Sequence, residues 1–339
     1  MNIFRKLLFP VALIYWLVTF IRNFLYDIGM FKSESFDIPI IAVGNLSVGG
    51  TGKSPQIEYL IRLLSSKYQV ATLSRGYKRS TTGFVLADHN ANANTLGDEP
   101  FQFFSKYPKI IVAVDENRVE GIKILLELDK KPNLILLDDA YQHRKVKAGF
   151  YILLTAYDDL FCDDFILPFG NLRETSFGKN RADMIIVTKC PNNIDELVQK
   201  KIKDKLKVLQ PIYFTTISYD VNVYNESGQL SVNEIKEEEK VVVAGIAKPK
   251  PFFDFLEAKS SETMIFSDHH NFEERDINSI LNKAKKNKII TTEKDYVRLK
   301  DKLPKEQLYY LPIQSRFLNA STHFDKTINN YVEQSPRNR

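Results

Sequence analysis

One stretch constrains this chain more than any other: Ser47-Val48-Gly49-Gly50-Thr51-Gly52-Lys53-Ser54. The apolar run Ile40–Val43 precedes it closely, and a helical pattern opens after it at Pro55. A strand, a glycine-rich turn and a helix in this order are typical of a P-loop, whose backbone N–H groups and helix N-terminus surround phosphate oxygens. Ser47 stands where the motif usually begins with glycine. We therefore predict that residues 47–54 bind the phosphates of a nucleotide.

Two side chains of this loop have defined chemistry. In a P-loop the lysine, here Lys53, reaches the β- and γ-phosphates, and the following hydroxyl, here Ser54, ligates Mg²⁺. Further along, the apolar run Leu134–Leu137 ends in two carboxylates, Asp138 and Asp139. A buried strand that ends in aspartate downstream of a P-loop typically holds the same metal ion. The sequence therefore predicts a Mg²⁺ site made by Ser54 with at least one of the two aspartates.

Short apolar runs alternate with helical patterns between residue 38 and about residue 217. The candidate strands are Ile40–Val43, Val70–Leu73, Ile110–Val114, Leu134–Leu137, Tyr151–Leu154, Met184–Val187 and Tyr213–Ile217. Continuous apolar runs of this length indicate parallel strands that are covered on both faces. We therefore predict an α/β fold, a P-loop NTPase-like, doubly wound and mostly parallel sheet, with its ligand at the carboxyl ends of the strands.

The pattern divides the chain into four predicted segments. They are an apolar, membrane-associating N-terminal helix at 1–30, the P-loop domain at 31–217, a polar linker or hairpin at 218–240, and a smaller C-terminal α/β domain at 241–330. In the last of these, apolar runs such as Val241–Ala244 and Ile289–Thr292 again alternate with helical patterns. The final dozen or so residues are polar, and we expect them to fray.

The N-terminal run 7–21 contains no charged residue and has basic residues at both ends. As a helix it covers roughly 22 Å, which is less than the ~30 Å hydrocarbon core of a bilayer. Three structures suit such a run: a helix inserted into one leaflet, a helix that spans the bilayer, and a buried core helix. Tyr15, Trp16 and the flanking basic residues favour insertion into one leaflet.

Composition excludes some classes of protein. The net charge of +5, from 47 basic and 42 acidic residues, is too small to indicate nucleic-acid binding, and no stripe of aromatic and basic residues is present. The only cysteines, Cys162 and Cys190, lack the spacing of a zinc site and indicate a reducing compartment. Nothing in the sequence indicates an obligate protein partner.

The segment Gly97-Asp98-Glu99-Pro100 lies between the second and third predicted strands. An enzyme that moves a phosphoryl group onto a hydroxyl needs a carboxylate to accept or orient the hydroxyl proton, and Asp98 is a candidate. The alternative is that Asp98 caps the helix that begins at Pro100.

Six other residues follow strands and are expected to face the same cleft. They are Arg75 and Tyr77 after the second strand, Gln142 and His143 after the paired aspartates, and Arg173 and Glu174 after the fifth strand. A basic side chain in such a place can bind phosphates or an anionic substrate. The alternatives are an exposed surface arginine and, for His143, a structural partner of the site.

Two segments of the smaller domain also end predicted strands. In Asp268-His269-His270, a histidine beside a carboxylate could act as a base with a tuned pKa. Binding of a metal by the two histidines is a weaker alternative, because no further histidine or cysteine lies nearby in the sequence. The functional role of residues 293–295 stays open.

Together these motifs resemble the tetraacyldisaccharide 4′-kinases of lipid A synthesis. The resemblance covers nearly the whole chain in order and includes the apolar N-terminus. The most specific motifs are Val43-Gly44-Asn45 before the P-loop and Asp138-Asp139-Ala140-Tyr141-Gln142-His143; the others are Arg75-Gly76-Tyr77, Gly97-Asp98-Glu99-Pro100, Leu172-Arg173-Glu174 and Asp268-His269-His270. The chain departs from the family pattern at Ala140-Tyr141, where the family has Gly-Phe, and at Lys78, where it has glycine.

The resemblance implies an enzyme that transfers the γ-phosphate of ATP, with Mg²⁺, to the 4′-hydroxyl of a tetraacylated glucosamine disaccharide 1-phosphate. It implies Asp98 as the base and a histidine of the smaller domain as its assistant, which we assign to His269, with His270 as the alternative. It also implies a location on the cytoplasmic face of the bacterial inner membrane, where the N-terminal helix anchors the enzyme beside its glycolipid substrate.

Two other classes of protein are compatible with a P-loop. A GTPase or metallochaperone reads guanine with Asn-Lys-x-Asp after a late strand, but here that strand ends in Thr188-Lys189-Cys190-Pro191. A membrane-tethered scaffold with a decayed P-loop is disfavoured because Lys53, Ser54 and the paired aspartates are intact.

Overall fold

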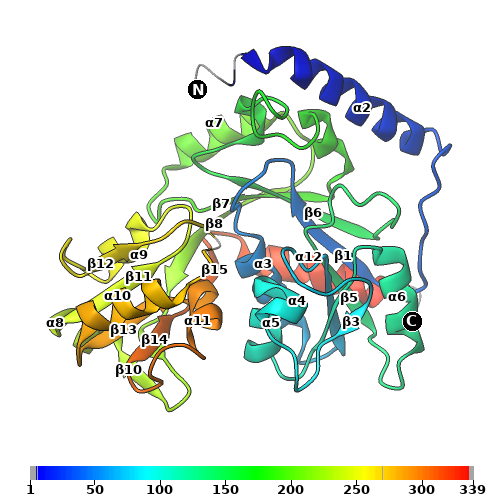
Figure 1. Ribbon diagram of the computed structural model, residues 1–339. Helices are drawn as coiled ribbons and strands as arrows, with labels where there is room; N and C mark the ends of the chain where they lie inside the picture. The colour runs from blue at the N-terminus through cyan, green and yellow to red at the C-terminus, as the bar shows by residue number, and fades with distance from the viewer. Residues whose placement is uncertain (1–4, 6, 269, 336–339) are drawn as a thin grey trace.

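The computed structural model describes residue 5 and residues 7–268 and 270–335. Two β-sheets lie side by side in it, one of nine strands and one of six, and helices pack on each of them (Figure 1). We call the nine-stranded sheet with its helices the P-loop unit, and the six-stranded sheet with its helices the second unit.

The sheet of the P-loop unit has the strand order β15-β8-β7-β6-β1-β5-β2-β4-β3. Its strands are β1 (Ile40–Asn45), β2 (Val70–Ser74), β3 (Val85–Leu86), β4 (Ile111–Val114), β5 (Leu134–Asp138), β6 (Phe150–Ala156), β7 (Met184–Thr188), β8 (Ile212–Tyr219) and β15 (Ile313–Phe317). The edge strands β3 and β15 are antiparallel to their neighbours, and the others are parallel. All seven strands predicted from the apolar runs are present, so the doubly wound, mostly parallel α/β fold is confirmed.

Strand β1 is the centre of this sheet. All of its residues are buried, and β5 and β6 pair with it on opposite sides. The chain therefore crosses the sheet in both directions from β1, and such a reversal creates a crevice at the carboxyl ends of the strands. The P-loop begins at this end of β1.

Helices cover both faces of the sheet. They are α3 (Lys53–Leu64), α4 (Ala93–Leu96), α5 (Asp98–Lys106), α6 (Arg118–Glu127), α7 (Glu196–Leu206) and α12 (Ser321–Gln334). Apolar residues of α3 recur at helical spacing and pack with α12 against one face, whereas α6 packs against the other. The helical patterns of the sequence near 55–67, 98–106, 117–130 and 193–208 predict four of these helices, α3, α5, α6 and α7, and they are confirmed with ends that shift by a few residues.

The second unit has the strand order β10-β9-β14-β13-β11-β12. Its elements are β9 (Asn222–Tyr224), β10 (Gln229–Ser231), α8 (Val232–Glu237), β11 (Lys240–Ala244), α9 (Lys250–Phe255), β12 (Thr263–Ile265), α10 (Glu274–Ala284), β13 (Lys288–Thr292), α11 (Glu293–Leu299) and β14 (Leu308–Leu311). Strands β9 and β10 form the antiparallel hairpin that was one of the two possibilities for 218–240, and β9 pairs with β14. The hairpin is therefore part of the second sheet.

The C-terminal segment differs from the prediction. Strand β15 pairs with β8, and the buried residues Phe324, Ile328 and Val332 of α12 complete the core of the P-loop unit. Residues 313–330 therefore lie with the P-loop unit and not with the smaller domain, and the chain does not fray before Gln334. The division of the chain into independent domains stays a prediction.

The N-terminal helix α2 (Phe9–Asp27) lies along the outer edge of the P-loop unit (Figure 1). Among the described residues it is the single helix long and apolar enough to cross a membrane, and 6% of its apolar window is buried. Only Ala12 of the helix is buried. Because almost all of the apolar surface of α2 is exposed, the alternative of a core helix is wrong.

Candidate active site

The P-loop connects β1 to α3 and is fixed from two sides. The backbone N–H of Val48 donates to the Asn171 carbonyl at 2.8 Å, and the Thr188 hydroxyl donates to the Thr51 carbonyl at 2.7 Å. Gly49 and Gly52 have φ angles of 108° and 83°, a left-handed conformation that strains residues with a Cβ. These contacts hold the backbone of the loop in place before a nucleotide arrives.

Lys53, the first residue of α3, points toward the paired aspartates. Its Nζ lies 3.4 Å from Asn45 Oδ1 and 3.6 Å from Asp139 Oδ1. Ser54 follows in the first turn of α3 and is half-buried. The structure thus brings Lys53 together with Asp139, and the role of the Ser54 hydroxyl as a metal ligand stays a prediction.

Asp138 has the environment of a metal ligand. It is 6% exposed, and the Ser74 hydroxyl donates to its Oδ2 at 3.4 Å. Among the residues that the structure describes, none donates to its other oxygen, the buried Oδ1. Burial, with the neighbouring charge of Asp139, raises the pKa of Asp138 to about 7. A divalent cation would give the orphaned oxygen a partner and would favour the ionised carboxylate, so these residues fit Mg²⁺.

Asp139 is paired with two cations. Its Oδ1 accepts a hydrogen bond of 2.8 Å from Arg173 and lies 3.6 Å from Lys53. Although burial opposes ionisation, these two positive charges hold the pKa of Asp139 below its usual value. Arg173 therefore contacts a carboxylate that the sequence assigned to the metal, and its binding of a substrate or phosphate stays a prediction.

Arg118, the first residue of α6, is a site residue that the sequence did not indicate. It is 3% exposed, and burial lowers its pKa to about 10, although Asp138 and Asp139 oppose that shift. Its Nε has no acceptor among the described residues. A buried guanidinium near the paired aspartates could bind an anionic oxygen of a substrate. The only signal in the sequence is that Arg118 follows a strand.

Gln142 and Glu174 support the site from behind. Gln142 Nε2 donates to the Asn45 carbonyl at 2.8 Å and to Glu174 at 3.1 Å. Glu174 is 3% exposed and also accepts hydrogen bonds from Asn23 of α2 and from Arg181. These contacts tie α2 to the loop after β5. Direct contact of Gln142 or Glu174 with a substrate stays a prediction.

His143 is held neutral. Burial and the nearby positive charges of Arg118 and Lys145 lower its pKa to about 4. An unfolded chain has a histidine pKa of about 6.5, so between these values the unfolded state binds a proton that the folded state does not. The free energy of unfolding should therefore fall as the pH drops from about 6.5 to about 4.

This pH dependence can be measured with the His143→Gln variant. The free energy of unfolding would be measured by urea unfolding at pH 7.5 and at pH 5. Between these two pH values we expect it to fall by about 1–2 kcal/mol more in the wild type than in the variant, after discounting for the partial exposure of His143. Equal losses in the two proteins would show that His143 titrates normally in the folded state.

The predicted residues after β2 lie beside the predicted base. Arg75 and Tyr77 are exposed in the turn that follows β2. Gly97 packs against the backbone of that turn: a Cβ atom added to Gly97 would lie 3.1 Å from the Tyr77 carbonyl oxygen. Gly97 has a φ of 92° and precedes Asp98, which begins α5 and is 6% exposed. Glu99 is near enough to contribute to the raised pKa of Asp138. The start of α5 therefore lies near Asp138.

The second unit contacts Asp98 through α11. Both carboxylate oxygens of Asp98 accept hydrogen bonds from Arg298, at 2.8 Å for the bond from Nε to Oδ1. His270 instead contacts Asp276 of its own unit, with 2.8 Å between Nε2 and Oδ2. His269, the assigned assistant of Asp98, lies outside the described residues, so that assignment stays a prediction.

Residues 293–295, whose role was open, have structural contacts. Glu293 accepts hydrogen bonds from Lys106 and from the backbone N–H of Ile313. Asp295 is fully buried and accepts hydrogen bonds from the Gly245 N–H and the Thr292 hydroxyl. Both carboxylates therefore stabilise the start of α11 and its contacts.

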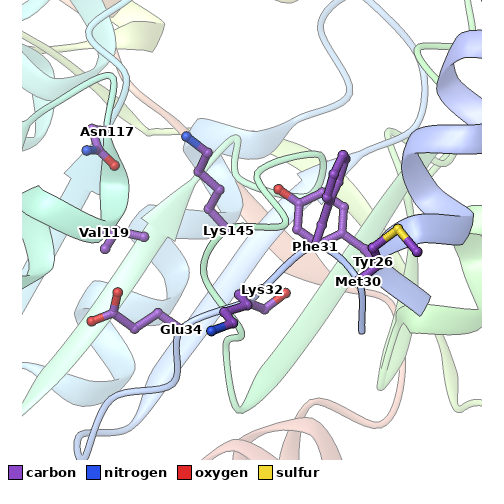
Figure 2. Close-up of a pocket in the computed structure, with 9 residues that line it drawn as sticks. Tyr26, Met30, Phe31, Lys32, Glu34, Asn117, Val119 and Lys145 are labelled. Atoms are coloured by element: carbon purple, nitrogen blue, oxygen red, sulfur yellow. The ribbon is translucent and has the colours of Figure 1, made fainter. Parts of the chain in front are cut away.

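An open cavity of about 650 Å³ lies between the end of α2 and the start of α6 (Figure 2). Its lining residues are Tyr26, Met30, Phe31, Lys32, Ser33, Glu34, Asn117, Val119 and Lys145. Figure 2 shows the rings of Tyr26 and Phe31 on one side and Asn117 and Val119 on the other, with Lys145 between them. The cavity thus combines apolar surface with two lysines and one carboxylate, that of Glu34, next to the element that carries Arg118.

Known proteins are similar to this chain in sequence and in fold. A family model described as tetraacyldisaccharide-1-P 4′-kinase matches residues 4–333. The tetraacyldisaccharide 4′-kinase of Flavobacterium johnsoniae is 61% identical over 99% of both chains. That of Bacteroides thetaiotaomicron is 43% identical over 98% of this chain and 95% of its own. The crystal structure of "apo" form LpxK from Aquifex aeolicus in complex with ATP has a TM-score of 0.79 at 28% identity, covering 97% of this chain and 100% of that one. The chain therefore belongs to the tetraacyldisaccharide-1-P 4′-kinase family.

Proposed function

We propose that this enzyme transfers the γ-phosphate of ATP to the 4′-hydroxyl of a tetraacyldisaccharide 1-phosphate, which gives the 1,4′-bisphosphate. The observation that carries the proposal is the convergence of Lys53, Asp138 and Asp139 at the carboxyl end of β1. The P-loop backbone and Lys53 would bind the β- and γ-phosphates. Ser54 and the two aspartates would hold Mg²⁺, which when bound neutralises negative charge on the phosphate oxygens.

Asp98 would act as the base. In the reaction the 4′-hydroxyl oxygen forms a bond to the γ-phosphorus while its proton passes to the Asp98 carboxylate. The bond between the γ-phosphorus and the bridging oxygen breaks, and ADP leaves with that oxygen. The position of Asp98 at the start of α5, beside the metal site, supports this role.

The cavity beside α2 offers a place for the rest of the acceptor. Its apolar side chains could contact acyl chains, and Lys32 and Lys145 could contact an anionic group. Because α2 carries exposed apolar residues at the same edge of the molecule, a lipid could pass between a membrane and this cavity without crossing water.

We place α2 in one leaflet of the cytoplasmic face of the inner membrane. Polar contacts tie the helix to the P-loop unit along its length: Tyr15 to the Arg173 carbonyl, Arg22 to the Gln142 carbonyl and Asn23 to Glu174. A spanning helix would draw these polar partners, among them the Glu174 carboxylate, toward the hydrocarbon, at a cost of several kcal/mol for each. The contacts therefore support a helix that lies parallel to the membrane surface.

The Ile14→Asp/Val18→Asp double variant tests this placement. Both side chains are exposed on α2, at 65% and 59%. We expect the variant to lose at least about 10-fold in binding to anionic phospholipid vesicles, because charged groups replace inserted apolar ones. Its kcat on substrate dispersed in detergent should stay within about twofold. Val221→Asp, at a 74% exposed position away from α2, is the control and should bind vesicles normally. Equal vesicle binding by all three proteins would contradict the placement.

A nucleotide assay separates the kinase from the rival classes. Release of the nucleoside diphosphate should be faster with ATP, which gives ADP, than with GTP, which gives GDP, and should depend on the lipid acceptor. A GTPase would prefer GTP and hydrolyse it without lipid, and a scaffold would release neither ADP nor GDP.

A further inference from the structure

Helix α11 of the second unit faces the N-terminal end of α5, where the proposed base lies (Figure 1). Two of its basic residues, Lys294 and Arg298, are one helical turn apart and therefore project from one face. Arg298 contacts Asp98, and Lys294 lies 3.9 Å from Glu99 and 3.2 Å from Asp268. One face of α11 thus contacts both acidic residues at the start of α5.

Arg298 makes the more specific of these contacts. Its Nε and Nη2 donate to the two oxygens of Asp98, and its Nη1 donates to the His270 carbonyl at 2.7 Å. The side chains of Arg298 and Asp98 are 15% and 8% exposed. A planar guanidinium with two parallel hydrogen bonds fixes the plane of a carboxylate, which a lysine cannot do.

We infer that Arg298 is a positioning residue for phosphoryl transfer, because it holds the carboxylate of Asp98 in one orientation toward the acceptor hydroxyl. The inference rests on the proposed role of Asp98 as the base. A carboxylate has about four lone-pair positions, so it can accept hydrogen bonds from a guanidinium and from a substrate hydroxyl together. The second unit thereby contributes to catalysis through a residue that does not touch the substrate.

Cohesion between the two units does not depend on Arg298 alone. Lys106 of α5 bridges Glu293 of α11, at 2.6 Å, and Glu58 of α3, at 2.7 Å. Lys300 lies over the Phe101 ring of α5, 4.8 Å from its centroid. These contacts connect the second unit to α5 without touching Asp98. A variant that removes one of them is therefore a matched control for a purely structural role of Arg298.

The test compares Arg298→Ala and Arg298→Lys with Lys300→Ala, each with measurement of Tm, kcat, and KM for ATP. We expect both Arg298 variants to lose roughly 10- to 100-fold in kcat, because small misplacements of a reacting group have effects of this size. KM for ATP should stay within about twofold, and Lys300→Ala should match the wild type. Arg298→Lys keeps the charge and the bulk, so its loss would isolate the two-bond geometry even if Arg298→Ala melts early.

A double variant completes the test. In the Asp98→Asn background, adding Arg298→Ala should change kcat by less than about twofold, because the group that Arg298 positions is already gone. Wild-type kcat in Arg298→Lys, or a full further loss in the double variant, would overturn the positioning role. Wild-type kcat in Asp98→Asn alone would instead show that the proposed base is wrong, so the two failures are distinguishable.

Discussion

The Lys53→Ala variant is expected to lose at least about 100-fold in kcat while it keeps its fold. The Lys53 ammonium lies at the end of the P-loop, between Asn45 Oδ1 and Asp139 Oδ1. Negative charge moves onto the bridging oxygen as ADP leaves, so a fixed cation there stabilises the transition state more than the ground state. The measurement is kcat at saturating ATP and lipid, with circular dichroism to confirm folding.

Lys189→Ala is the matched control for this prediction. Lys189 also donates to the P-loop, but to the backbone carbonyl of Gly50 on its outer side. We expect its removal to change KM for ATP more than kcat. If Lys53→Ala had the wild-type kcat, the nucleotide site would lie elsewhere. If Lys53→Ala and Lys189→Ala lost kcat equally, a general disturbance of the P-loop would explain the loss in Lys53→Ala.

The Asp98→Asn variant should lose at least about 100-fold in kcat with little change in ATP affinity, which is the usual effect of removing a general base. Asparagine has nearly the shape of aspartate and keeps one oxygen as an acceptor for Arg298. It cannot, however, take up the proton of the acceptor hydroxyl. Single-turnover measurements with saturating substrates would separate this loss in the chemical step from a change in product release.

Glu99→Gln provides the control for Asp98→Asn, because it removes one negative charge from the next position of the same helix. It should keep kcat within roughly threefold, since Glu99 adds to the local field and pairs with Lys294 at 3.9 Å but is not the proposed base. Comparable losses in the two variants would indicate that the overall charge at the start of α5 matters, and not proton transfer to Asp98.

The core of the fold was predictable because buried parallel strands are continuous apolar runs. Strand β15 was missed because Ile313–Phe317 contains glutamine, serine and arginine, and it is an edge strand with partly exposed faces. Helix α12 was missed because its three buried residues are separated by polar ones. The return of this segment to the larger sheet is a long-range contact, which local patterns do not encode.

The sequence predicted those site residues whose position follows from the strands that they come after. Residues at the carboxyl ends of neighbouring parallel strands must meet, so the closeness of Lys53 and Asp139 follows from topology. Arg118 and Arg298 were not found, because only tertiary contacts distinguish them from other helical arginines. Glu174 was expected to face a substrate, whereas its carboxylate is buried among Gln142, Asn23 and Arg181.

The most direct test of the account is the mass of the lipid product. Purified enzyme would be incubated with ATP, Mg²⁺ and tetraacyldisaccharide 1-phosphate, and the lipid extract would be analysed by mass spectrometry, with Lys53→Ala as the control. The account predicts one added phosphate on the distal sugar with the wild type and almost none with the variant. An unchanged lipid in the presence of the folded wild-type enzyme and both substrates would contradict it.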